Sequence, residues 1–320
     1  MTKIQAVSRL IRLPNLIMVV LTMYLMRWSV IRPILDLLGF DPEMPEWSFA
    51  LLVLSTLFIT AAGNVINDFH DVKADRVNHP DRVVIDRFIS RRQAILTHFT
   101  LNIIGVLLGI LIAFYHRIEW LFLVFLVVPG LLWLYSLSLK NMALIGNLVV
   151  SLLTGTVPLL VLMFEYPLLI HAHQDILQNE PDLFKPILYW IAAFALFAFL
   201  TNLIRELVKD AQDIPGDLEA GSQTLAIRIG IKSLKRLVFV ITILTLAVLG
   251  YIFFYYLPDW ISLVYFVVFL AIPFILVLYK LIRARESQDF KPISYLAKLI
   301  MFFGILYAPV AYYIMHSFIR

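Results

Sequence analysis

Nine apolar windows, each about 20 residues long, constrain the fold of this chain more than any other feature. An apolar helix of about 20 residues spans the hydrocarbon core of a bilayer, which is roughly 30 Å thick. The windows cover residues 14–34, 48–67, 94–115, 119–138, 142–164, 186–205, 236–257, 260–282 and 293–315. The sequence therefore predicts an all-α integral membrane protein. We expect nine transmembrane helices in one bundle around a central cavity, forming a single domain over residues 1–320.

The composition agrees with this prediction and excludes several kinds of chemistry. Of the 320 residues, 61% are hydrophobic and 15% are charged, whereas soluble domains are nearer half apolar and a quarter charged. The first window is the weakest candidate for a membrane span, because Arg27 and Arg32 lie in its second half. Cysteine is absent, which excludes disulfides, thiolate nucleophiles and cysteine-bound metals.

The 26 Lys and Arg residues are unevenly divided between the two sides of the predicted bundle. If the N-terminus is cytoplasmic, twenty of them lie on the cytoplasmic side, whereas the opposite loops are rich in Asp and Glu. This is the positive-inside pattern. We therefore expect a multi-pass plasma-membrane protein whose N-terminus and long polar loops are cytoplasmic. The same pattern explains the net charge of +4 without nucleic acid as a partner.

One acidic stretch, NDFHDVKAD, follows the cytoplasmic end of the second window. On a helix that continues from this window, Asn67, Asp71 and Asp75 recur every four residues and share one face. Asp68 flanks that face. We call Asn67–Asp75 the first acidic motif.

A second acidic stretch, RELVKDAQDIPGD, follows the sixth window on the same side. Its carboxylates step by four, three and four residues: Glu206, Asp210, Asp213 and Asp217. These positions again share one helical face. We expect Pro215 and Gly216 to end the helix before Asp217. We call Asp210–Asp217 the second acidic motif.

Two carboxylate faces on one side of a membrane indicate a cation site. Like charges four residues apart destabilise a helix unless something neutralises them. Mg²⁺ binds oxygen ligands and usually shares a few carboxylates with a phosphate-bearing substrate. Basic residues that can hold phosphate oxygens are interleaved with the motifs: Lys73, Arg76, Arg82, Lys140 and Lys209. Each run alone has the alternative interpretation of solvated loop charges, but the matched pair favours a site for a diphosphate.

These motifs resemble those of a known family. NDFHDVKAD resembles the NDxxDxxxD signature of the UbiA superfamily of intramembrane prenyltransferases, and DAQDIPGD resembles its DxxDxxxD signature. LYSLSLK is similar to the Tyr/Lys motif between them, and GSQTLAIRIG to the stretch that follows. The resemblance implies Mg²⁺-dependent transfer of a prenyl group from an isoprenyl diphosphate donor to a lipophilic acceptor, within the membrane lipid.

The resemblance also implies roles for individual residues. The implied Mg²⁺ ligands are Asn67, Asp68, Asp71, Asp75, Asp210, Asp213 and Asp217. The implied catalytic residues are Asp71, Asp75, Asp210, Asp213 and Lys140. The implied substrate-binding residues are Arg12, Asn67, Arg82, Tyr135, Lys140 and Lys209. Two departures matter: Tyr135 is one residue further from Lys140 than the family spacing, and RVVIDRFIS replaces a Pro-rich loop of which only Arg82 matches.

The acceptor is open at this point. The motif segments look most like the digeranylgeranylglyceryl phosphate branch, which attaches a geranylgeranyl group to geranylgeranylglyceryl phosphate in ether-lipid synthesis. Arg87, Arg91 and Arg92 are either contacts for the acceptor phosphate or positive-inside signals, and we favour the second interpretation. An alternative acceptor is an aromatic quinone precursor such as dihydroxynaphthoate or hydroxybenzoate. More distant alternatives are a non-catalytic scaffold and a transporter, although acidic residues at one membrane face are not typical of a transporter.

Three further polar residues, His70, Glu206 and Asn147, have two possible roles each, and His79 has one. His70 is a candidate metal ligand or base, but we interpret it as an exposed histidine, and His79 as a loop residue. Glu206 either accepts a proton from the acceptor or pairs with a basic neighbour. Asn147 either packs against another helix or lines the cavity.

Overall fold

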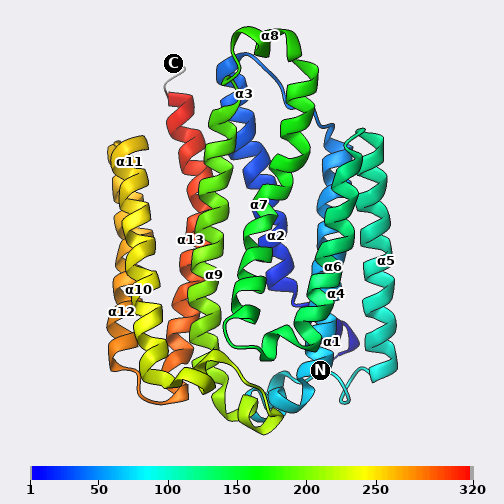
Figure 1. Cartoon of the computed structure of the whole chain (residues 1–320), viewed down its shortest axis with the longest axis vertical. Coiled ribbons are helices and arrows are strands. Elements are labelled where there is room, and N and C mark those ends of the chain that lie inside the picture. Colours follow the sequence, from blue (N-terminus) through cyan, green and yellow to red (C-terminus); the bar gives the residue numbers. More distant parts are fainter. Residues whose placement is uncertain (1, 318–320) are drawn as a thin grey trace.

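The computed structural model describes residues 2–317, with the side chains of Arg82 and Ser317 outside the described part. The chain forms an all-helical bundle (Figure 1). Among the described residues, nine helical segments are long and apolar enough to cross a membrane, which confirms the predicted number of spans. These segments are Leu13–Leu38, Glu46–Asn78, Arg91–Tyr115, Glu119–Leu137, Ile145–Ala172, Lys185–Ala220, Leu225–Tyr256, Trp260–Arg283 and Ser287–His316. The central cavity and the single-domain boundary stay predictions.

The α-helices carry the labels of Figure 1. They are α1 (Lys3–Leu10), α2 (Leu13–Leu25), α3 (Arg32–Leu38), α4 (Glu46–Asn78), α5 (Arg91–Tyr115), α6 (Phe122–Leu137), α7 (Ile145–Ala172), α8 (Gln174–Asn179), α9 (Lys185–Ala220), α10 (Leu225–Tyr256), α11 (Trp260–Tyr265), α12 (Ile272–Arg283) and α13 (Phe290–Ser317). Short 3₁₀ segments are η2 (Pro80–Arg82), η3 (Glu119–Leu121), η4 (Leu139–Asn141) and η6 (Ser287–Asp289), and π segments are η1 (Met26–Ile31) and η5 (Phe266–Ala271).

Helices α4 and α9 are much longer than a bilayer requires. They contain 33 and 36 residues, or about 50 Å each at 1.5 Å per residue, against a hydrocarbon core of roughly 30 Å. The polar excess lies at their C-terminal ends, so both acidic motifs are helical continuations of spans. The two ends lie at the same end of the bundle, the lower one in Figure 1. We call this the motif end.

The predicted helix end at Pro215 and Gly216 is wrong. Helix α9 continues through both residues to Ala220, and Gly221, with a φ of 76°, ends it in the left-handed conformation. Proline removes one backbone donor but does not stop a helix whose neighbours supply the missing contacts. Asp217 therefore lies on the same helix as Asp210 and Asp213.

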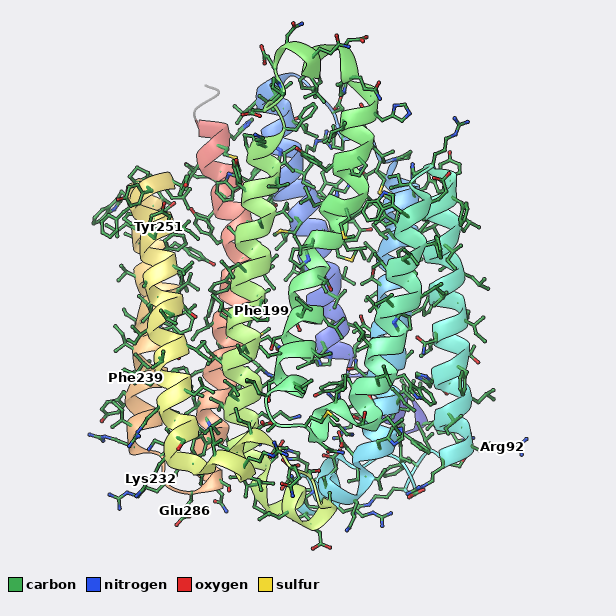
Figure 2. The ribbon with its side chains drawn as sticks, viewed as in Figure 1. Arg92, Phe199, Lys232, Phe239, Tyr251 and Glu286 are labelled. Carbon is green, nitrogen blue, oxygen red and sulfur yellow. The ribbon has the colours of Figure 1, made fainter. Side chains whose placement is uncertain are left out.

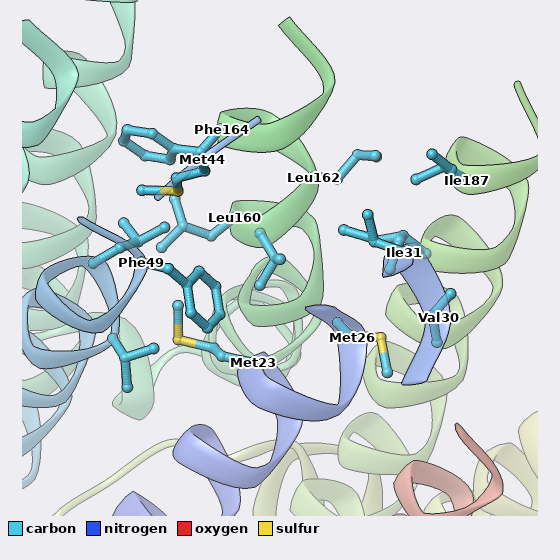
Figure 3. Packing of buried hydrophobic residues seen from close by; sticks show 14 of the residues in the cluster. Met23, Met26, Val30, Ile31, Met44, Phe49, Leu160, Leu162, Phe164 and Ile187 are labelled. Carbon is cyan, nitrogen blue, oxygen red and sulfur yellow. The ribbon is translucent and has the colours of Figure 1, made fainter. Parts of the chain in front are cut away.

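Two large apolar clusters form the core, and α9 contributes to both. The first joins α2, η1, α4, α7 and the N-terminal half of α9, and Figure 3 shows Met23, Met26, Phe49 and Leu160 from it. The second joins the C-terminal half of α9 with α10, α12 and α13. Because α9 contributes to both clusters, it connects the two halves of the bundle along its length.

Arg27, which weakens the first window, is buried and paired. Its Nη1 donates to Glu165 Oε2 at 2.8 Å, and its Nη2 donates to Glu46 Oε1 at 2.9 Å. Arg27 and Glu165 are 2% and 1% exposed. Arg32 instead lies over the ring of Trp28, at 4.7 Å from its centre. The charges in this span are thus compatible with membrane insertion, since intramembrane charges are normally paired.

Candidate active site

Four segments meet at the motif end of the bundle. The C-terminal ends of α4 and α9 carry the two acidic motifs. The junction between α1 and α2 carries Arg12, and η4, between α6 and α7, carries Lys140. Polar side chains gather at this end (Figure 2), where the labelled Arg92 and Lys232 also lie.

Arg12 lies at a strained turn that docks on α4. Its φ of 54° places it in the left-handed region, which costs a non-glycine residue energy and is often found at functional sites. Its Nη2 donates to Asp68 Oδ1 at 2.6 Å, and the neighbouring Ile11 carbonyl accepts from Asn64 Nδ2 at 2.9 Å. The charge of Asp68 raises the pKa of Arg12 above its ordinary value. The turn therefore holds a permanent cation against the first motif.

Lys140 approaches the same motif from another side. Its Nζ donates to Asp71 Oδ1 at 2.5 Å, and Asn67 Nδ2 donates to Asp71 Oδ2 at 2.8 Å. Three residues separate η4 from helix α7, which packs closely on η4 at Gly146, where a Cβ would lie 2.7 Å from the Leu139 carbonyl oxygen. This close approach fixes the backbone from which Lys140 extends. Asp71 is consequently held at both of its oxygens.

The second motif is surrounded by different partners. Asn147 Nδ2 on α7 donates to Asp210 Oδ2 at 3.1 Å. Asp213 lies 3.3 Å from His79 Nε2 and 3.9 Å from Lys209 Nζ. Asp210 is thus tied to α7 and Asp213 to the end of α4.

Glu206, one turn before the second motif, pairs with a basic neighbour. Arg205 Nη1 donates to its Oε1. The structure therefore shows the ion pair that was one of the two predicted alternatives for Glu206.

The two motifs and Tyr135 form one electrostatic group. Asp217 interacts with Asp71 across the site, and Lys209 interacts with Asp75. The Tyr135 phenol on α6 interacts with Asp71 as well. The carboxylates of α4 and α9 are therefore close enough to interact electrostatically, although they are about 140 residues apart in sequence.

The charges in this group do not balance. Arg12 neutralises Asp68 and Lys140 neutralises Asp71. Among the described side chains, no basic nitrogen lies within 4.0 Å of the carboxylates of Asp75, Asp210 or Asp217. A surplus of facing carboxylates attracts a cation, because like charges repel at short range.

The donor set fits Mg²⁺. Carboxylate and amide oxygens are its preferred protein ligands, and Asn67 Oδ1 is buried without a hydrogen-bond partner. Within the part of the chain that the structure describes, no three Asp, Glu or His side chains already form a metal-binding cluster. Arg12 and Lys140 instead hold oxygens of the first motif. The residues thus suit a metal that arrives together with a phosphate, which would draw these two cations away.

The structure brings together all but one of the predicted site residues at the motif end. They are Arg12, Asn67, Asp68, Asp71, Asp75, Tyr135, Lys140, Lys209, Asp210, Asp213 and Asp217. The side chain of Arg82 lies outside the described part of the structure. His70 is exposed on α4, as interpreted from the sequence.

Two of the three arginines between α4 and α5 make contacts within their own segment; the three are Arg87, Arg91 and Arg92. Arg87 Nη1 donates to the Pro80 carbonyl at 2.7 Å, and Arg91 lies 3.3 Å from Asp86. Arg92 extends away from the bundle in Figure 2. These contacts hold the segment between α4 and α5 and do not bring the arginines to the acidic motifs.

Four residues that contact the site or hold its segments were not assigned to it from the sequence. Asn147 binds Asp210, and His79, interpreted as a loop residue, binds Asp213. Asn78 and Asn141 hold the segments that carry the motifs and Lys140. The only sequence signal for them is a polar side chain in or beside a span, which does not identify its partner.

Comparison with known proteins gives a consistent result. The UbiA prenyltransferase family matches residues 37–315. A digeranylgeranylglyceryl phosphate synthase of Methanosphaera stadtmanae is 30% identical over 259 residues, which cover 81% of this chain and 84% of that protein. A synthase of the same name from Thermococcus kodakarensis is 35% identical over 190 residues, covering 59% of this chain and 60% of the relative, less than two thirds of its length.

Solved structures share the fold. One of a digeranylgeranylglyceryl phosphate synthase is 23% identical, with a TM-score of 0.63 over 98% of this chain and 99% of that one. A UbiA homologue from Archaeoglobus fulgidus bound to GPP and Mg²⁺ is 15% identical, with a TM-score of 0.54 over 95% of this chain and 99% of that one.

Proposed function

Because this chain belongs to the UbiA prenyltransferase family, we propose that it transfers a geranylgeranyl group from geranylgeranyl diphosphate to geranylgeranylglyceryl phosphate, with Mg²⁺ as cofactor. Two relatives, at 30% and 35% identity, are named as synthases of the product. Both substrates carry an apolar tail and a charged head, which suits a site where membrane spans end in carboxylates and cations.

The observation that carries the proposal is the meeting of two acidic helix faces with two cations from elsewhere in the chain. Arg12 reaches Asp68 from the α1–α2 turn at 2.6 Å, and Lys140 reaches Asp71 from η4 at 2.5 Å. A diphosphate needs both metal ions and direct cationic donors around its oxygens. This arrangement supplies ligands for the first and side chains for the second.

We assign Mg²⁺ binding to Asn67, Asp68, Asp71, Asp75, Asp210, Asp213 and Asp217. Bound there, Mg²⁺ would neutralise charge that develops on the departing diphosphate. Arg12, Lys140 and Lys209 donate hydrogen bonds to diphosphate oxygens, and Arg82 is assigned to the same group. Tyr135 interacts electrostatically with Glu206, Asp71 and Asp210, and we assign its hydroxyl to orienting the head group.

The reaction then requires little covalent participation by the protein. The allylic carbon–oxygen bond breaks and the diphosphate leaves with the electron pair. The acceptor hydroxyl oxygen forms the new ether bond with the allylic carbon, and its proton passes to the departed diphosphate. Preorganised cations stabilise the charge that develops in this step, and the apolar spans exclude water that would otherwise capture the allylic cation.

The motif end is assigned to the cytoplasm. The positive-inside rule relates Lys and Arg in short loops to the cytoplasmic side, and twenty of the 26 basic residues lie at or near the motif end. In this orientation the site is open to water-soluble Mg²⁺ and to the diphosphate head of the donor.

The test is transfer by the purified protein in detergent. Labelled geranylgeranyl diphosphate and Mg²⁺ are offered with either geranylgeranylglyceryl phosphate or dihydroxynaphthoate. We expect a labelled ether lipid with the first acceptor. Chelation of Mg²⁺ or the Asp71→Asn substitution should abolish it, whereas Asp36→Asn, at an exposed position of α3, should not. Label on the naphthoate alone would refute the acceptor, and absence of transfer to both would refute the proposed function.

A further inference from the structure

Helix α9 has a local weakness inside the second motif. Pro215 has no backbone N–H, and its ring disfavours regular geometry in the preceding turn. Asp213 and Asp217 lie on either side of this proline. Their relative position consequently depends on whatever stabilises the helix across residues 213–217.

Asn78, the last residue of α4, supplies contacts at this place. Its Nδ2 donates to the backbone carbonyl of Asp213 at 2.9 Å, and its Oδ1 accepts from the backbone N–H of Gly216 at 2.8 Å. One amide thus makes two hydrogen bonds to the backbone on both sides of Pro215. These contacts fasten α9 to α4 on both sides of the proline, where the helix lacks one backbone hydrogen bond.

Gly216 allows α4 and α9 to come this close. A Cβ on Gly216 would lie 2.5 Å from the Ala74 carbonyl oxygen and would also overlap the Asn78 amide. The close approach lies one turn from Asp75 and one residue from Asp217. Asn78 and Gly216 therefore form the point at which the two acidic helices touch.

A second contact ties the end of α9 to Lys140. Ser222 Oγ, just beyond α9, donates to Asn141 Oδ1 at 2.9 Å, and the backbones of Met142 and Gln223 form a bridge. With the Lys140–Asp71 pair, these contacts close a ring through α4, α9 and η4. Asn78 is the member of this ring that bonds α4 directly to α9.

We propose that Asn78 is a positioning residue that fixes the distance between the acidic faces of α4 and α9 through its two hydrogen bonds across Pro215. The expected effect of this spacing on the affinity for Mg²⁺ rests on the proposed function. The spacing of α4 and α9 itself, however, is measurable without turnover. Asn78 does not touch the reacting atoms.

The first experiment measures this spacing directly. The chain has no cysteine, so Val77→Cys with Leu218→Cys places two spin labels at exposed positions, one on each helix. We expect a narrow distance distribution by electron paramagnetic resonance in the otherwise unchanged chain. Asn78→Leu, which retains bulk but loses both hydrogen bonds, should give a broader and longer distribution. The same distribution in both would overturn the proposal.

The second experiment separates positioning from a general loss of stability. In Asn78→Leu, the Mg²⁺ concentration for half-maximal transfer should rise about tenfold, as expected from two lost hydrogen bonds, while KM for the acceptor stays the same. Asn78→Asp retains the acceptor for the Gly216 N–H and should give an intermediate Mg²⁺ requirement. Asn102→Leu, which removes a comparable amide contact to His98 at 3.1 Å on α5, is the matched control and should change neither readout.

The outcomes distinguish the two proposals. If the unchanged protein transfers no prenyl group, the proposed function fails, and the spin-label distances still decide the role of Asn78. If transfer occurs but Mg²⁺ dependence and distances are identical in all variants, Asn78 is not a positioning residue. If Asn78→Leu does not fold, Asn78→Asp is measured in both assays, and unchanged values there overturn the inference.

Discussion

The buried pair of Arg27 and Glu165 makes a quantitative prediction about stability. Arg27 donates to Glu165, to Glu46 and to the Met44 carbonyl, and Glu165 Oε1 accepts from the Glu43 backbone N–H at 2.5 Å. The pair joins the first span to α7 and to the segment before α4, at the end of the bundle opposite the motifs. Both side chains are almost completely buried.

Removing one partner leaves the other charge buried and unpaired, which typically costs about 3–5 kcal/mol. Arg27→Met should therefore lower the free energy of unfolding by about 3–5 kcal/mol. Glu165→Gln should cost less, about 1–3 kcal/mol, because the glutamine oxygen still accepts from the backbone and Arg27 keeps Glu46. The double variant buries no unpaired charge, so we expect it to lose about 2–4 kcal/mol less than the sum of the single losses.

The measurement is reversible unfolding of the four proteins in mixed micelles, analysed as a double-mutant cycle. If the loss in the double variant equals the sum of the two single losses within about 0.5 kcal/mol, the two residues are energetically independent. That result would refute the argument that each leaves the other unpaired. As a control, transfer activity below the unfolding transition should be unchanged in Glu165→Gln, since the pair lies far from the motif end.

Three further predictions concern the motif end. Gly216→Ala should lower both thermal stability and activity because its methyl group would overlap α4, whereas Gly130→Ala, which meets open space, should be neutral or slightly stabilising; equal melting temperatures would contradict this. Arg12→Gly should remove the strain of the left-handed backbone but also the ion pair with Asp68. The free energy of unfolding should therefore fall by at most about 1 kcal/mol, whereas KM for the donor should rise at least tenfold in a steady-state assay. Lys140→Met should lower kcat by about 10²–10³-fold, the usual loss for one charge-stabilising donor, and a kcat that stays within a few-fold of the original would argue against direct contact with the diphosphate.

Span number and the faces of the acidic motifs were predictable because both depend on local periodicity. Asn67, Asp71 and Asp75 lie on one turn-by-turn face of any helix, so their grouping follows once α4 continues beyond the membrane. Apolar windows likewise depend on bilayer thickness and not on tertiary contacts. The Pro215 prediction failed because the rule for helix ends is also local, whereas α9 packs against α4 at this point through two hydrogen bonds of Asn78.

Partners from distant parts of the sequence were not predictable. Asn147 and Asp210 are 63 residues apart, and Arg27 and Glu165 are 138 apart. A single sequence gives the polarity of each residue but not the rotation of its helix relative to the others. In the sequence, Arg27 argued against a membrane span at residues 14–34. In the structure, its pairing with the buried Glu165 makes that span compatible with the membrane.

The continuity of α4 and α9 from one side of the membrane to the acidic motifs has a mechanical consequence. Each helix is about 50 Å long, so a change in tilt of about 10° around its middle moves its end by about 4 Å. Magnesium–oxygen bonds tolerate far smaller displacements, because the ion demands near-ideal octahedral geometry. Helices change tilt when bilayer thickness changes. A change in the thickness of the surrounding lipid would therefore change the distance between the two acidic motifs, and the contact of Asn78 with α9 lies near the ends of both helices, where that change would be greatest.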